Sequence, residues 1–335
     1  MRRATLEITY QGKNISKDIA PDLLSFAFRE KADGEADELE LNLADPDRLW
    51  QDDWAPEKGD SLRALIRCEN WFEPGDAYEL DCGGFEVDED ELSSTSGGDT
   101  VSIKAVPAVV KSSLAGQKKS RAWEGASLER IAKDISKGAG LSLVYEAEGI
   151  ALQRIDQRQE TDLAFLQRLC SEQGCRLKIA DKEMIVFAGV RADALEPASI
   201  TRQKGDNFRA KRVTAEVYSG VKVAYMDPTT GKKYEYSYKD ASAPATGKTL
   251  TINKRCENPA QAQRIGLAEL RKKNAKKYEA EWSGMGNPLL RAGATVKIEG
   301  WGQYDGTYAI KEAGHEMSDG GKYTSSVKLE SAQDF

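Results

Sequence analysis

Both ends of this chain are built from short runs in which apolar residues alternate with polar ones. In the first 110 residues, Gly, Pro, Asp and Asn separate these runs, which is the pattern of half-buried antiparallel strands joined by turns. The alternating positions are Leu6, Ile8 and Tyr10; Leu24, Phe26 and Phe28; Leu39, Leu41 and Leu43; Leu62, Ala64, Ile66 and Cys68; Phe85 and Val87; and Val101, Ile103 and Ala105. About five to seven strands at this spacing predict a small barrel or sandwich.

The strand pattern returns after about residue 205. Its alternating positions are Val213, Ala215 and Val217; Val221, Val223 and Tyr225; Tyr234, Tyr236 and Tyr238; Tyr278, Ala280 and Trp282; Val296 and Ile298; Tyr308 and Ile310; and Tyr323, Val327 and Leu329. The composition of residues 227–231 predicts a hairpin turn. One helix interrupts the strands, with Asn258 as its N-cap, Pro259 at its first position and basic residues 271–273 near its end.

An α/β pattern lies between these two β regions. Its clearest helix has Thr161 as the N-cap and Gly174 as the stop, and Leu163, Leu166 and Leu169 recur at helical spacing. A hairpin follows, with its turn at residues 181–182. An earlier helix is capped by Ser127, and the polar, basic segment 111–125 before it lacks periodicity, which predicts a linker or exposed arm.

The length of 335 residues favours two or three domains. We predict a mainly β protein with α+β character, in which an α/β connector over residues 113–195 separates two small antiparallel β-barrels. The first barrel is expected over residues 1–112. The second is expected over residues 196–335, with a helix inserted at about 258–274.

Composition excludes several classes of protein. No run approaches the roughly 18 apolar residues that span a bilayer, and the N-terminus lacks the apolar core of a secretion signal. We therefore expect no membrane partner and synthesis in a cytoplasm. Five scattered cysteines argue against a disulfide framework, and the single histidine, His315, would have to serve any triad or zinc hydrolase site. No metal or other cofactor is predicted.

Three local clusters invite a chemical interpretation. The acidic run 86–91 lacks the spacing of a calcium loop and predicts a solvated strand end. The basic cluster 271–277 suggests phosphate contacts, but the net charge of −7 disfavours general nucleic-acid binding, so a helix-end or intersubunit role is favoured. His315 has no nucleophile or metal pattern beside it, which favours a structural role.

One segment stands out as a signature, comprising Gln157, Glu160, Thr161, Asp162, Leu163, Phe165, Leu166, Arg168, Leu169 and Gly174. It resembles the signature of the phage late control gene D proteins, whose fold is shared with the hub part of type VI secretion VgrG proteins. Residues 36–41, 59–62 and 84–88 are similar to the first tube-like barrel of the family, and residues 287–293 and 306–310 to the second. The resemblance spans nearly the whole chain.

The resemblance implies a structural baseplate hub of a contractile tail or a related injection device, such as a tailocin. Such a hub is a homotrimer whose two tube-type barrels per subunit join a hexameric inner tube to a trimeric spike. It implies a separate spike protein, an inner tube protein, and wedge and tape-measure proteins as partners. It also implies assembly in the bacterial cytoplasm and residence in the particle, with no specific nucleic acid although the genome passes through the lumen.

The residues implied as signature or interface positions are not catalytic. They are Gln157, Glu160, Asp162, Phe165, Leu166, Arg168, Leu169, Gly174, Gly293, Gly306 and Tyr308. The polar helix face with Glu160, Arg168 and Glu172 is a candidate for contacts between subunits. Two alternatives stay open: a tail-associated cell-wall hydrolase, since a carboxylate pair is not excluded by counting, and an effector-delivery hub of the VgrG type.

Overall fold

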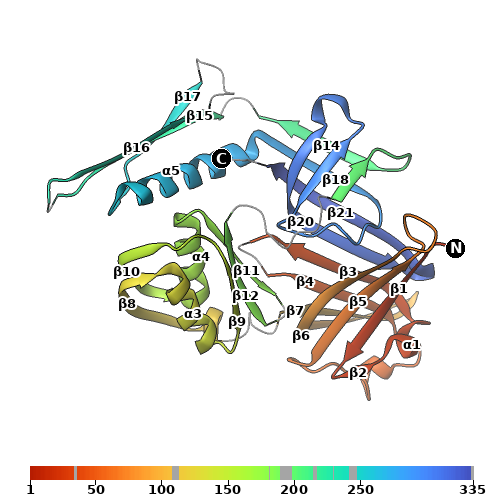
Figure 1. The fold of residues 1–335 in the computed structure, drawn as a ribbon. Coiled ribbons are helices and arrows are strands. Elements are labelled where there is room, and N and C mark those ends of the chain that lie inside the picture. The colour runs from red at the N-terminus through yellow and green to blue at the C-terminus, as the bar shows by residue number, and fades with distance from the viewer. Residues whose placement is uncertain are drawn as a thin grey trace.

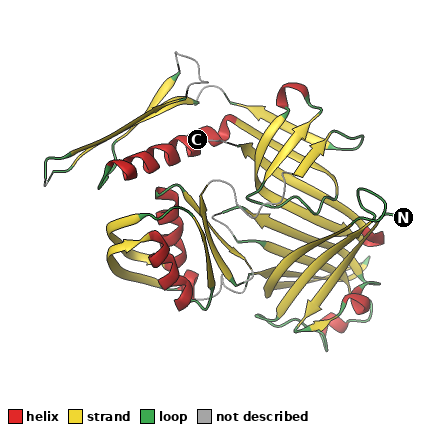
Figure 2. Ribbon diagram, viewed as in Figure 1, coloured by secondary structure: helices red, strands yellow, loops and turns green. Residues whose placement is uncertain are grey.

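The computed structural model describes residues 1–33, 36–107, 113–180, 182–188, 198–213, 217–228, 230–240 and 247–332. Strands dominate these residues, and the helices gather in a few places (Figure 2). The predicted mainly β class is confirmed. The predicted limits at residues 112, 195, 196 and 335, and the expected turn residue Asp181, lie outside the described residues.

The N-terminal β region follows the predicted alternation except at Leu24, which is exposed, because the pairing of β3 with β4 shifts register between Leu23 and Ser25. Its elements are β1 (Arg3–Tyr10), β2 (Lys13–Asn14), α1 (Ser16–Ile19), β3 (Leu23–Lys31), β4 (Glu38–Ala44), η1 (Leu49–Gln51), β5 (Ser61–Glu69), β6 (Ala77–Thr95) and β7 (Gly98–Val106). Alternate side chains such as Phe26, Phe28, Leu41 and Ile66 are fully buried in one core. The intervening residues face outward, because successive side chains of a strand point to opposite faces.

The C-terminal β region has its own core. Its elements are β13 (Ala198–Thr201), β14 (Asn207–Arg212), β18 (Tyr278–Met285), β19 (Thr295–Glu299), η4 (Gly302–Tyr304), β20 (Gly306–Ser318), η5 (Asp319–Gly321) and β21 (Lys322–Ser331). Trp282, Tyr308, Ile310 and Leu329 lie in this core. The strand predicted around Val213 and Val217 is wrong: β14 ends at Arg212, where its pairing with β18 ends, and Ala215 lies outside the described residues.

Strand β20 joins the two β regions directly. It pairs antiparallel with β3 from Glu312 opposite Lys31 to Ser318 opposite Ser25, and with β21 on its other side. The described strands of both regions therefore form one 13-stranded sheet, along the path β14-β18-β21-β20-β3-β4-β7-β6-β5-β1-β2. Figure 1 shows the red N-terminal strands continuing into the blue C-terminal ones. This path is open at both ends, so closure of each region into a barrel stays a prediction.

The connector is a separate α/β unit with its own core. Its elements are α2 (Ser113–Gly116), β8 (Lys118–Ser127), α3 (Leu128–Gly138), β9 (Ser142–Glu146), β10 (Ala151–Thr161), α4 (Asp162–Glu172), β11 (Cys175–Ala180) and β12 (Glu183–Ala188). Thr161 and Ser127 cap α4 and α3 as predicted, each accepting a backbone N–H. The linker predicted over 111–125 is wrong where residues are described, because β8 pairs with β10 along its length.

The helix inserted in the C-terminal half belongs to a small unit of its own. Strands β15 (Tyr218–Met226), β16 (Lys233–Lys239) and β17 (Lys248–Ile252) form a three-stranded sheet, on which α5 (Pro259–Asn274) packs. Asn258 caps α5 as predicted. Gly266 lets the helix approach closely, since a Cβ there would lie 2.9 Å from Val223. We call β15–β17 with α5 the inserted unit. A short 3₁₀ turn, η3 (Ala275–Lys277), then leads from α5 into β18.

No helix among the described residues is both long and apolar enough to cross a membrane.

Candidate functional site

The buried carboxylate of the signature residue Asp162 is bound by the signature residue Gln157 and by two basic residues of β8. It lies at the start of α4 and accepts hydrogen bonds from Lys119 Nζ at 2.7 Å, Arg121 Nη2 at 2.5 Å and Gln157 Nε2 at 2.9 Å. Burial alone would raise the pKa of Asp162, but these donors and the two cations outweigh burial and lower the pKa. The carboxylate therefore ties β8 to the helix start, which explains why this basic segment is an ordered strand.

An aromatic stack lies beside this carboxylate. The rings of Trp123 and Phe165 are parallel within 7°, with centroids 5.1 Å apart. The Arg121 guanidinium lies 4.6 Å from the Trp123 ring centre, and that of Arg168 lies 5.4 Å from the Phe165 ring centre. Cation–π contacts of this kind stabilise a surface while keeping the charges in contact with water.

The polar face predicted on α4 is paired within the chain. Arg168 donates to Glu160 at 3.2 Å and lies 3.6 Å from Glu172, one helical turn further on. Glu160 itself lies on β10, not on the helix. These pairs orient the face, and its role in contacts between subunits stays a prediction.

The apolar signature residues support the connector core. Phe165, Leu166 and Leu169 are fully buried there. Gly174 follows α4 with a φ of +76°, and a Cβ at this position would meet that of Ala268 on α5 at 3.4 Å. This glycine thus provides the left-handed residue that ends the helix and also lies against the inserted unit.

Replacing Gly174 with alanine should lower the free energy of unfolding by about 1–2 kcal/mol, because an L side chain is strained at positive φ. Gly140 follows α3 with a φ of +72°, and a Cβ there would meet no atom within 4 Å, so Gly140→Ala is a matched control. Denaturant unfolding should show that the two variants lose the same free energy of unfolding within about 0.5 kcal/mol. A much larger loss for Gly174→Ala would show that its cost comes mainly from the contact with α5 and not from the backbone conformation.

The remaining predicted positions lie apart from the signature, in the C-terminal β region. Gly293 has a φ of +87°, and its N–H donates to the carbonyl of Ile310. Gly306 begins β20 with a φ of +154°. Tyr308 is buried in the core of this region, and its hydroxyl donates to the carbonyl of Tyr304 at 2.8 Å. All three residues shape the ends of β19 and β20.

A buried junction, which the sequence patterns did not predict, links the connector to both β regions. Glu30 on β3 accepts hydrogen bonds from Lys178 Nζ on β11 at 2.6 Å and from Arg291 Nε before β19 at 2.9 Å. The backbone N–H of Ala292 also donates to it at 2.9 Å. Asp37 lies 3.7 Å from Lys178 Nζ and accepts the N–H of Lys31. We call Glu30, Asp37, Lys178 and Arg291 the junction.

The pKa values of the two carboxylates in the junction shift in opposite directions. Burial would raise the pKa of Glu30, but Lys178 and Arg291 outweigh burial and lower the pKa. Burial dominates at Asp37 and, with the nearby charge of Glu30, raises its pKa to about 6. One sequence signal pointed to this site: Glu30 continues the inward-facing series of Phe26 and Phe28, where a carboxylate needs a partner.

His315 is a structural histidine. It is fully buried, with Nε2 3.0 Å from the carbonyl oxygen of Leu290 and Nδ1 2.7 Å from the hydroxyl of Tyr323. Because a carbonyl only accepts, Nε2 carries the proton and Nδ1 accepts from the hydroxyl. Burial lowers the pKa of His315 to about 4, so the ring is neutral at pH 7.

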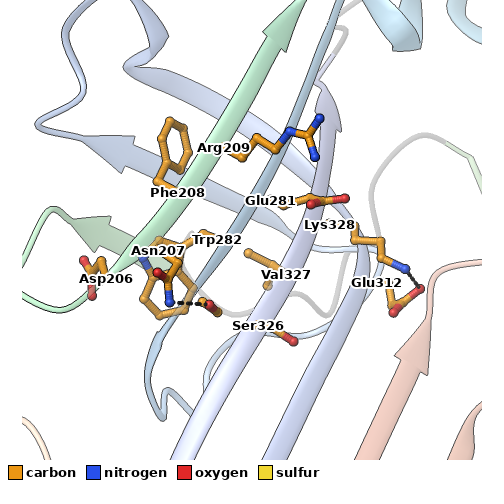
Figure 3. Close-up of a pocket in the computed structure, with 11 residues that line it drawn as sticks. Asp206, Asn207, Phe208, Arg209, Glu281, Trp282, Glu312, Ser326, Val327 and Lys328 are labelled. Atoms are coloured by element: carbon orange, nitrogen blue, oxygen red, sulfur yellow. Dashed lines mark hydrogen bonds and ion pairs between the residues drawn. The ribbon is translucent and has the colours of Figure 1, made fainter.

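The outer face of the joined sheet carries rows of alternating charge. Arg209, Glu281, Lys328 and Glu312 lie on four neighbouring strands in adjacent register positions. They line a depression of about 580 Å³, in which Lys328 Nζ donates to Glu312 at 3.1 Å. Figure 3 shows how these side chains lie on the neighbouring strands. The row extends onto β3, where Lys31 lies 3.5 Å from Glu312. Within this row, Lys328 and Lys31 both pair with Glu312, and cross-strand pairs of opposite charge stabilise a sheet.

The described residues include no group of three or more His, Cys, Asp or Glu side chains placed to hold a metal ion. The junction does bring two buried carboxylates together, but Lys178 and Arg291 bind the oxygens of Glu30.

Solved structures with this fold come from phage tails and related systems. A tail protein from Neisseria meningitidis MC58 superposes with a TM-score of 0.72 at 14% identity, covering 98% of this chain and 97% of that one. The 43 kDa tail protein of prophage MuSo2 from Shewanella oneidensis superposes with a TM-score of 0.69 at 15% identity, covering 97% of this chain and 98% of that one. A component of the type VI secretion system from E. coli superposes with a TM-score of 0.57 at 11% identity, covering 92% of this chain and 73% of that one. The fold is thus that of tail-type proteins.

Sequence comparison identifies the family. Residues 91–321 match the model of the phage tail baseplate hub (GPD) family. A probable baseplate hub protein of Escherichia phage P2 is 28% identical over 222 residues, which cover 64% of this chain and 54% of that protein. The corresponding protein of phage 186 is 25% identical over 236 residues, covering 68% and 58%. The chain therefore belongs to the phage tail baseplate hub family, which confirms the resemblance to late control gene D proteins.

The match spans little more than half the length of these two relatives.

Proposed function

We propose that the chain acts as a homotrimeric hub that adapts a six-fold inner tube to a three-fold spike. The observation that carries this proposal is the pairing of β3 with β20, which fixes two β regions side by side in one chain. Three copies then present six β regions to a six-fold ring and three identical subunits to a three-fold spike.

A rigid connection between the two β regions is what such an adaptor needs. The β3–β20 pairing supplies one link, and the junction adds a buried one, in which Arg291 of the C-terminal region bonds to Glu30 of the N-terminal region. Lys178 brings the connector into the same link. The two β regions therefore keep one relative orientation when the ring assembles, so neighbouring copies meet the same surface.

The proposed partners are a separate spike protein, the inner tube protein, and baseplate wedge and tape-measure proteins. The hub is assembled in the bacterial cytoplasm, performs no catalysis, and binds no specific nucleic acid although the genome passes through its lumen. An effector-delivery hub of the VgrG type uses the same architecture and differs in its cargo. No described feature favours the alternative of a cell-wall hydrolase.

Light scattering of the purified chain should give a mass three times the 36.9 kDa of one chain, alone or after mixing with its tube and spike proteins. Electron microscopy of that species should show a three-fold ring with six similar lobes. A mass of one chain under every condition would contradict the proposal. Cleared zones on a cell-wall zymogram would instead support the hydrolase.

A further inference from the structure

A groove of about 920 Å³ runs between the connector, the inserted unit and the outer sheet face. Its walls are the end of α4 and start of β11 on one side and the second half of α5 on the other, with β14, β18 and β21 beneath (Figure 1). Small residues form much of its lining: Ser171, Gly174, Ala268, Ala275, Ala280, Ala309, Ser331 and Ala332. An extended backbone can lie close to such a surface, since few side chains stand in its way.

Cations outnumber anions along this groove. Eight basic residues line it, namely Arg176, Arg209, Lys211, Arg271, Lys272, Lys276, Lys311 and Lys328. Five acidic residues line it, namely Asp33, Glu269, Glu279, Glu281 and Glu330. Arg176 pairs with Glu330 at 3.1 Å and Lys211 with Glu279 at 3.7 Å. Within the described chain, Arg209, Lys272, Lys276 and Lys311 have no carboxylate within ion-pair distance of their side chains.

Two guanidinium groups lie near each other in the wall. Burial and the charge of Arg176 lower the pKa of Arg271, so these cations repel each other in a partly desolvated place. Arg176 is held there by Asp33 and Glu330. An anion entering the groove would offset this repulsion, and planar guanidinium groups bind carboxylates with two parallel hydrogen bonds.

The inserted unit is basic in a chain that is otherwise acidic. The inserted unit together with η3, residues 218–277, holds 13 Lys and Arg against 5 Asp and Glu, a formal charge of +8, whereas the whole chain carries −7. The remaining residues therefore carry −15. A charge asymmetry of this size indicates an anionic partner for the basic part, because long-range attraction raises the rate of encounter.

We propose that this groove binds an extended acidic segment of a partner protein. Carboxylates of that segment would pair with Lys272 on α5, with Lys276 on η3 and with Arg209 and Lys311 on the sheet, while its backbone lies along the small residues. Glu269 and Glu281 line the same groove and would repel a continuous phosphate backbone, which favours a peptide over nucleic acid. The proposal does not depend on the trimer.

Fluorescence polarisation with a labelled 12-residue peptide, (Asp-Ser-Gly)₄, tests the proposal. The unmodified chain should bind it saturably at low salt, and the same peptide with Asn in place of Asp should not bind. Lys272→Glu combined with Lys276→Glu should weaken binding at least tenfold, or about 1.4 kcal/mol. Lys232→Glu combined with Lys239→Glu makes the same charge change in the inserted unit, outside the groove, and should weaken binding less than twofold.

Thermal unfolding of both double variants checks that each one folds. Equal weakening by the two double variants would overturn the proposal, because it would show diffuse attraction to a basic unit. Absence of saturable binding by the Asp peptide would also overturn it. Tighter binding of a labelled 12-nucleotide single-stranded DNA than of the peptide would replace the proposed occupant with nucleic acid.

Discussion

Replacing Glu30 with alanine should destabilise the folded chain by about 3–4 kcal/mol. The Glu30 carboxylate is fully buried and accepts from Lys178, from Arg291 and from the N–H of Ala292. Its removal leaves the ammonium of Lys178, which is 3% exposed, without its closest anion. Breaking a buried pair from one side is costly for this reason. Guanidinium unfolding followed by tryptophan fluorescence measures the loss.

Glu79→Ala is the matched control, since Glu79 is also a strand glutamate paired with an arginine, Arg67, but is exposed. It should cost less than about 1 kcal/mol. The double variant Glu30→Met with Lys178→Met should be more stable than Glu30→Met alone, because the buried ammonium of Lys178 is then no longer left without Glu30. Hydrogen exchange should speed up most in β11 and β20. If Glu30→Ala costs no more than Glu79→Ala, the junction does not hold the two β regions and the connector together.

Acidification should destabilise the chain through His315. The folded pKa is lowered to about 4 from 6.5, so the unfolded state binds more protons between these values. The contribution of His315 to the free energy of unfolding is therefore complete above pH 6.5 and is lost as pH falls toward 4. The free energy lost is at most about 3 kcal/mol. Because the chain has one histidine, NMR of the tag-free protein should show a single imidazole that stays neutral down to about pH 4.

His315→Gln should remove this pH dependence, since glutamine keeps a donor for Leu290 and an acceptor for Tyr323 but does not titrate. Asp37 acts in the opposite direction, because folding raises its pKa from 3.8 to about 6. Its contribution to the free energy of unfolding is therefore complete below pH 3.8 and is lost as pH rises through about 6. Asp37→Asn should therefore steepen the acid loss. An imidazole that titrates near 6.5 in the folded chain would contradict the buried, neutral assignment.

Local sequence patterns specify the helices and most of the strands. Asn258-Pro259, Thr161 and Ser127 start the three long helices, because a cap acts on backbone groups only two or three residues away. Alternation at Phe26, Phe28, Leu39 and Leu41 determined which strand faces are buried, since side chains alternate with a period of two. Signature residues Asp162, Phe165 and Leu169 were found for the same reason: they lie within one short segment.

Contacts between residues far apart in the chain specify how these elements join. The pairing of Lys31 with Glu312 and the bonds from Lys178 and Arg291 to Glu30 connect residues far apart in the chain, and no local pattern specifies which strand edges meet. The alternation does not predict the strand at 118–127, because its half-buried positions are Lys119, Arg121 and Trp123, and two of these three side chains are charged. Burial of charged groups depends on partners that tertiary contacts supply, so the junction and the groove appear only in the folded chain.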